Sequence, residues 1–78
     1  MKTKKDLAIE VLGNYENFGC ELKNEVYYKV LSRLENCKRN VLKDCLQFVN
    51  DHVHAEKKGA AAYVIFILTG ISLNIHQL

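Results

Sequence analysis

Residues 59–78, the last twenty of the chain, contain no aspartate, glutamate, lysine or arginine, whereas the residues before them are densely charged. A segment this apolar has to be buried against its own chain, a second copy, another protein or lipid, because exposed apolar surface costs roughly 25 cal/mol per Å². A chain of 78 residues makes one domain at most, and a single core of that size is only marginally sufficient. We therefore expect residues 1–78 to form a single small domain whose stability depends on how segment 59–78 is covered.

Composition and periodicity both predict helices. The chain has no proline and only four glycines, and it is rich in good helix formers. Between residues 20 and 57 the apolar side chains recur at steps of three and four. The residues of this stripe are Leu22, Val26, Val30, Leu34, Cys37, Val41, Cys45, Phe48 and His52. We predict an all-α fold, a small bundle of three to four helices at about 3–12, 20–36, 40–57 and 60–76.

The first helix has recognisable signals at both ends. Thr3 and Asp6 have the spacing of a capping box, with aspartate in place of the usual glutamate. Gly13 and Asn14 both tolerate the left-handed backbone conformation that ends helices, so we predict that this helix stops there. Residues 13–19 are then expected to form a loop that aromatic rings pin to the core.

The region from 20 to 57 could form one helix or two. One helix would be about 55 Å long, far beyond what so small a protein can cover. The polar residues 35–40 are the natural place for a turn, with Asn40 as the N-cap of the following helix. Lys57, Lys58 and Gly59 would end that helix, since cations and a following glycine suit a helix C-terminus.

Segment 59–78 has two possible structures. As a hairpin, residues 63–68 and 71–76 would flank a Thr-Gly turn, and residues 71–76 alternate between apolar and polar. As a helix, it carries an apolar seam at alternating steps of three and four, which is typical of a helix–helix interface. That seam consists of Ala61, Val64, Leu68, Ile71 and Ile75. The alanines at 60–62 and the helical partners upstream favour the helix.

Candidate chemical sites are weak. His52, Glu56 and Cys45 share one helix face and are zinc-ligand types, but no CxxC or HxxxH pair accompanies them. Three cysteines without a CxxC pair suggest a reducing, cytoplasmic setting. Phosphate-binding loops and nucleophile motifs are missing from the sequence as well. We expect no metal, no cofactor and no enzymatic activity.

The sequence therefore favours a small non-enzymatic protein that binds other proteins. We expect it to form a homo-oligomer, with a dimer favoured, through the seam of segment 59–78, and to regulate or inhibit an unidentified protein partner. The expected contact surface for that partner consists of Tyr28, Arg33, Lys38 and Arg39. One alternative is a nucleic-acid-binding transcriptional regulator that uses the basic turn 38–43. A tail-anchored membrane protein is another, although the apolar run 60–75 is shorter than the about 20 residues that span a bilayer.

Overall fold

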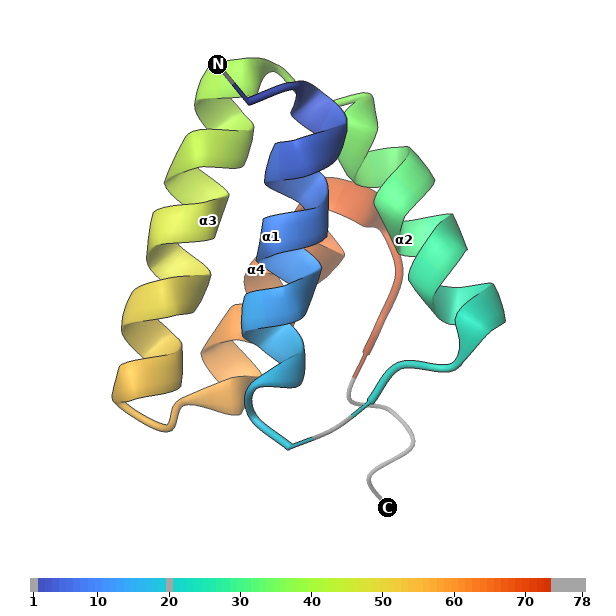
Figure 1. The fold of residues 1–78 in the computed structure, drawn as a ribbon. Coiled ribbons are helices and arrows are strands. Elements are labelled where there is room, and N and C mark those ends of the chain that lie inside the picture. The colour runs from blue at the N-terminus through green and yellow to red at the C-terminus, as the bar shows by residue number, and fades with distance from the viewer. Residues whose placement is uncertain (1, 20, 74–78) are drawn as a thin grey trace.

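The computed structural model describes residues 2–19 and 21–73, and within them the chain is an all-α bundle of four helices (Figure 1). The helices are α1 (Lys4–Glu16), α2 (Asn24–Glu35), α3 (Arg39–His54) and α4 (Lys58–Thr69). The predicted all-α class is confirmed. Residues 63–68 are helical, and the described residues contain no strand, so the hairpin alternative is wrong for this segment.

The first helix begins as predicted but ends later. The Asp6 N–H donates to the Thr3 hydroxyl (3.1 Å) and the Thr3 N–H donates to the Asp6 carboxylate (3.2 Å), so the capping box is confirmed. The predicted stop at Gly13 is wrong, because α1 continues to Glu16. The extra turn places Tyr15 in the core, 1% exposed, and this burial outweighs the cost of a glycine within a helix, about 1 kcal/mol.

Residues 21–57 contain two helices, which confirms the turn, although the predicted helix boundaries differ from the observed ones. The second helix begins at Asn24, and α3 begins at Arg39 with Lys38 as its N-cap, not Asn40. No side chain caps the start of α3. Tertiary packing of Leu42, Cys45 and Val49 determines where this helix begins, in place of a capping side chain.

The third helix ends before the predicted Lys57–Gly59 stop. Its C-cap is Ala55, and Glu56 takes the left-handed conformation, with φ of 57°. The Lys57 N–H donates to the His52 carbonyl (2.8 Å) and the Glu56 N–H to the Val53 carbonyl (3.1 Å). These two bonds form a Schellman motif. Lys58 and Gly59 belong to the first turn of α4, so the predicted stop at Gly59 is wrong.

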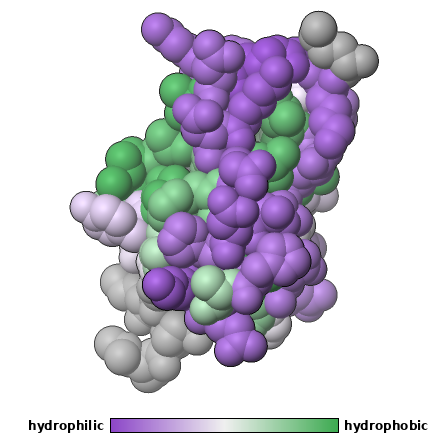
Figure 2. All heavy atoms as spheres, turned by 90° about the vertical axis from the view of Figure 1, so that its left-hand side faces the viewer, coloured by the Kyte–Doolittle hydropathy of each residue, from purple (hydrophilic) through white to green (hydrophobic). Residues whose placement is uncertain are grey.

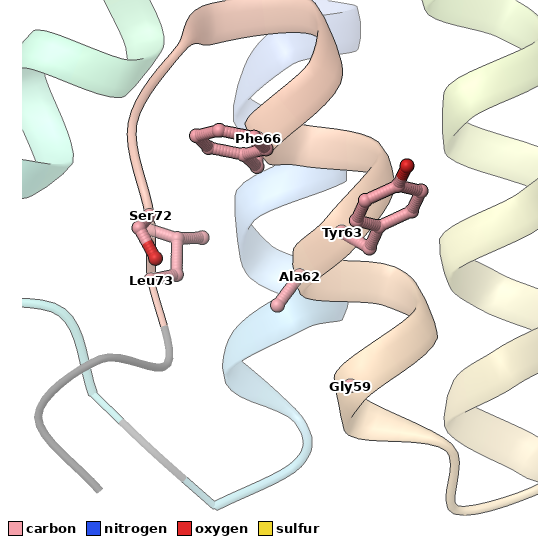
Figure 3. Close-up of a pocket in the computed structure, with 6 residues that line it drawn as sticks. All are labelled: Gly59, Ala62, Tyr63, Phe66, Ser72 and Leu73. Atoms are coloured by element: carbon pink, nitrogen blue, oxygen red, sulfur yellow. The ribbon is translucent and has the colours of Figure 1, made fainter.

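The fourth helix stops at Thr69, earlier than the predicted residue 76. Gly70 is its C-cap in the left-handed conformation, with φ of 75°, and the Ile71 N–H donates to the Thr69 hydroxyl (3.1 Å). The chain then turns back along α4 and buries Leu73, which is 7% exposed (Figures 1 and 3). The rest of the predicted helix, including Ile75, lies outside the described residues.

The four helices enclose one core. The first and third helices run parallel and make the most extensive interhelical contact, while α2 and α4 run in the opposite direction (Figure 1). The Arg39 guanidinium donates to the Lys2 carbonyl and so joins the N-terminal ends of α1 and α3. The largest fully buried side chains are Tyr15, Leu12, Leu34, Leu42, Ile65, Val11, Val30 and Val49.

Candidate functional site

The most distinctive surface of the molecule is the outward face of α4. Tyr63 is 62% exposed, Phe66 44% and Ile67 60%, although all three are large and apolar in body. They lie at steps of three and four residues, so they share one side of the helix. Figure 2 shows hydrophobic atoms gathered on the left of the view, the far side of Figure 1, where α4 lies. The surface over α3, which faces the viewer, is mostly hydrophilic.

A shallow, open depression of about 210 Å³ adjoins this face. Its lining residues are Gly59, Ala62, Tyr63, Phe66, Ser72 and Leu73. In Figure 3, Phe66 extends towards the returning segment that carries Ser72 and Leu73, whereas Tyr63 extends away from that segment. Nothing lies within 4 Å of where a Cβ on Gly59 would be, so the floor of the depression at the start of α4 is open.

The chemistry of this surface is that of a hydrophobic contact. Tyr63 is the one lining residue with a titratable side chain, and neither a carboxylate nor an amine lines the depression. With about 200 Å² for a large side chain, the three exposed residues present about 300 Å² of mainly apolar surface. Patches of this size on a small protein are frequently functional. We define Tyr63, Phe66 and Ile67, with Gly59 and Ala60 at the start of the helix, as the α4 face.

The described residues predicted to mediate self-association lie outside the α4 face. Ala61 is fully buried in the chain's own core, and Val64, Leu68 and Ile71 are partly buried against it. Ile75 lies outside the described residues. The side of α4 with the seam spacing therefore packs on the bundle, and the open side is the α4 face. Sequence reasoning missed these residues because α4 is apolar around its whole circumference, so periodicity alone could not indicate which side faces outward.

The four residues predicted to contact a partner lie on α2 and at the start of α3. Tyr28 is 64% exposed, and its ring meets that of Tyr27 edge-on, with centroids 5.3 Å apart. The Arg33 guanidinium donates to the Thr69 carbonyl (2.9 Å) and so ties α2 to the C-terminal end of α4. The Arg39 guanidinium donates to Lys2, as described above. Lys38 is exposed at the N-cap of α3. Both guanidinium groups therefore hold the backbone of another segment.

The basic turn 38–43 was the candidate nucleic-acid contact. Lys38, Asn40 and Lys43 are exposed there, and Leu42 is buried in the core. Asp44 is exposed directly beside Lys43, so cations and an anion alternate at the start of α3. The arrangement is that of an ordinary solvated helix face.

The candidate metal and thiol residues also take part in packing. The His52 ring stacks on Phe48 with centroids 3.8 Å apart, and its Nδ1 lies 2.8 Å from the Phe48 carbonyl oxygen. Cys45 is 3% exposed, and burial, with a smaller contribution from Cys37, raises the pKa of its thiol from 9.0 to about 12. Such a thiol is a poor nucleophile at neutral pH. Within residues 2–19 and 21–73, no three His, Cys, Asp or Glu side chains gather where they could hold a metal ion.

None of the helices in the described part of the chain combines the length and the hydropathy needed to cross a membrane. Comparison of the chain with protein-family models, with curated proteins and with solved structures gave no match.

Proposed function

We propose that this protein is a small helical interaction protein that forms a homodimer through the α4 face and regulates a protein partner. The observation that carries the proposal is the exposure of Tyr63, Phe66 and Ile67 on a helix that has no charged side chain after Lys58. Water around these side chains is released when the face is covered, and this release is the main driving force of association.

A second copy fits this face better than an unrelated surface would. Because the face is uncharged, two copies can meet without bringing like charges together, and two-fold symmetric dimers are the commonest assemblies. An apolar surface of about 300 Å² is too small for a whole interface, because each partner in a standard interface buries about 800 Å². It is of the right size for the apolar centre of one, with a rim from the ends of α4.

The regulated partner would then bind on the part of the dimer away from α4. Tyr28 on α2 is the most exposed large hydrophobic side chain of the described residues. Tyrosine is enriched among the residues that dominate binding energy at interfaces, since it combines a large apolar ring with a polar hydroxyl group. We assign the partner contact to Tyr28 and the exposed side of α2 around it.

Sedimentation equilibrium over a wide range of concentrations tests the homodimer. We expect the wild type to sediment as a dimer at high concentration, and the double variant Phe66→Ser/Ile67→Ser to sediment as a monomer, because it loses most of the apolar contact. Ile9→Ser is the matched control: Ile9 is a 40% exposed apolar residue on α1, outside the α4 face, so dimerisation should be unchanged. A wild type that stays monomeric, or a double variant that dimerises as tightly as the wild type, contradicts the proposal.

A further inference from the structure

We infer that the second copy docks with its α4 antiparallel, with the two-fold axis beside Tyr63, so that Phe66 and Ile67 of one copy cover Gly59 and Ala60 of the other. This inference rests on the proposed homodimer and adds the direction and register of its interface. Four observations support it: the order of large and small residues along α4, their angular positions, the open floor at Gly59 and the charge at the two helix ends.

The side chains of the α4 face are small at its N-terminal end and large at its C-terminal end. Gly59 and Ala60 lie four and three residues before Tyr63, and Phe66 and Ile67 lie three and four residues after it. At 1.5 Å per residue, both pairs lie about 5 Å from the level of Tyr63 along the helix axis. An antiparallel partner centred on Tyr63 brings the large pair of each copy to the level of the small pair of the other.

The angular positions agree with this register. At 100° per residue, Gly59 and Phe66 fall on one side of Tyr63, and Ala60 and Ile67 fall on the other side. A two-fold axis perpendicular to the helices keeps each side facing its own counterpart. Phe66 of one copy therefore meets Gly59 of the other, and Ile67 meets Ala60. A parallel dimer, with its two-fold axis along the helices, would instead place Phe66 on Ile67 and Gly59 on Ala60, which crowds one end of the interface and leaves the other end open.

The depression supplies the space that the Phe66–Gly59 contact requires. It is open above Gly59, where a Cβ would meet no atom within 4 Å, and Ala62 and Leu73 give it apolar walls. A volume of about 210 Å³ accommodates a phenyl ring. In Figure 3 the depression lies on the Phe66 side of α4, which is the side the two-fold axis assigns to the incoming ring.

Charge also favours the antiparallel direction. Lys57 is the N-cap of α4 and Lys58 is its first residue, so both lie at the positive end of the helix dipole. In an antiparallel dimer these cations approach the C-terminal end of the partner's α4, where the dipole is negative. In a parallel dimer they would approach the same two lysines of the other copy, so four cations would meet at the positive ends of two helices.

A charge-pair experiment distinguishes the two directions. Gly59 and Phe66 are exposed, and the antiparallel register brings Gly59 of one copy against Phe66 of the other, so Gly59→Glu and Phe66→Lys change the surface without opening the core. We expect Phe66→Lys to weaken the dimer at least about tenfold, because the ring contact is lost and the new cation enters an apolar depression. The double variant Gly59→Glu/Phe66→Lys should recover most of the loss, since each glutamate then faces a lysine across the interface.

The controls separate the failure of this inference from the failure of the homodimer. The matched variant Gly59→Lys/Phe66→Lys should dimerise no better than Phe66→Lys alone, and circular dichroism should show equal helix content in all variants. A double variant that dimerises more weakly than both single variants indicates parallel helices and overturns the inference, while the homodimer stands. A wild type that is monomeric at every concentration overturns the proposed function itself.

Discussion

At the scale of single residues, the end of α3 depends on a conformation that glutamate adopts at a cost. Glu56 has φ of 57° and is the one non-glycine residue with positive φ among those that the structure describes. Its two neighbouring hydrogen bonds complete the Schellman motif. This helix end could not be predicted, because the expected residue at such a position is glycine, and Gly59 three residues later was the obvious candidate. The hydrogen bond of Arg33 could not be predicted either, because its partner, the Thr69 carbonyl, lies 36 residues away in the sequence.

The strained backbone at Glu56 predicts that a glycine at this position increases the stability of the protein. Glu56→Gly should raise the free energy of unfolding by about 0.5–1 kcal/mol, because glycine adopts the left-handed conformation without the Cβ clash. Urea denaturation monitored by circular dichroism measures the change. Glu56→Ala is the control, since it removes the same carboxylate but keeps the Cβ. An equal gain in both variants would show that the negative charge near the helix C-terminus, and not the backbone, is responsible.

At the scale of elements, the sequence predicted that helices form but not where they stop. Amphipathic periodicity identified α2 and α3, because their polar and apolar sides differ, and the polar residues 35–40 indicated the turn between them. Glycine was a poor guide: Gly13 lies inside α1, while Gly70 ends α4. Which side of α4 packs inward also could not be predicted, since both sides are apolar and the choice depends on the three-dimensional packing of the other helices.

The two glycines should respond oppositely to alanine. Gly13→Ala should stabilise the protein by about 1 kcal/mol, because the residue is helical, and a Cβ there meets no atom within 4 Å. Gly70→Ala should destabilise it by about 1 kcal/mol, because φ is 75° at this position. Thermal unfolding of both variants gives the comparison. The Cβ at Gly70 would meet Arg33 only at an ordinary 3.6 Å, so crowding does not explain a loss there. Stabilisation by Gly70→Ala would contradict the assigned cap.

At the scale of the whole molecule, a single core links all four helices. Part of its composition was predictable, since Val30, Leu34 and Cys45 of the predicted apolar stripe are buried. The apolar segment 59–78 was also expected to be buried, but Tyr63, Phe66 and Ile67 are exposed. Cys45 lies within this core, where desolvation of the thiolate raises the thiol pKa to about 12. The thiol is therefore a probe of global unfolding.

This pKa shift predicts a loss of stability at high pH. The thiol pKa is 9.0 in the unfolded chain and about 12 in the fold, so below pH 9 the thiol is protonated in both states and its contribution is fully present. Between pH 9 and 12 only the unfolded chain ionises, and the free energy of unfolding falls by up to about 1.4 kcal/mol per pH unit. Urea denaturation at pH 8 and pH 10.5, under reducing conditions, measures this fall.

The control for this prediction is Cys45→Ala. The alanine variant should be less stable at pH 8, since it leaves a cavity, but should lose less stability between the two pH values. Equal losses in the wild type and the variant would show that the Cys45 thiol ionises as easily in the fold as in the unfolded chain.

The parallel contact between α1 and α3 has a consequence for how the chain can assemble. Neighbouring antiparallel helices can form a bundle by adding one hairpin after another, each closing a short loop. Here the most extensive contact joins helices that begin 35 residues apart, with α2 forming the crossover between them. The apolar side of α1 therefore stays partly exposed until α3 packs against it. Forming that contact requires the closure of a long loop, which costs conformational entropy. The arrangement of the helices makes folding a collective event, in which no half of the chain is a stable intermediate on its own.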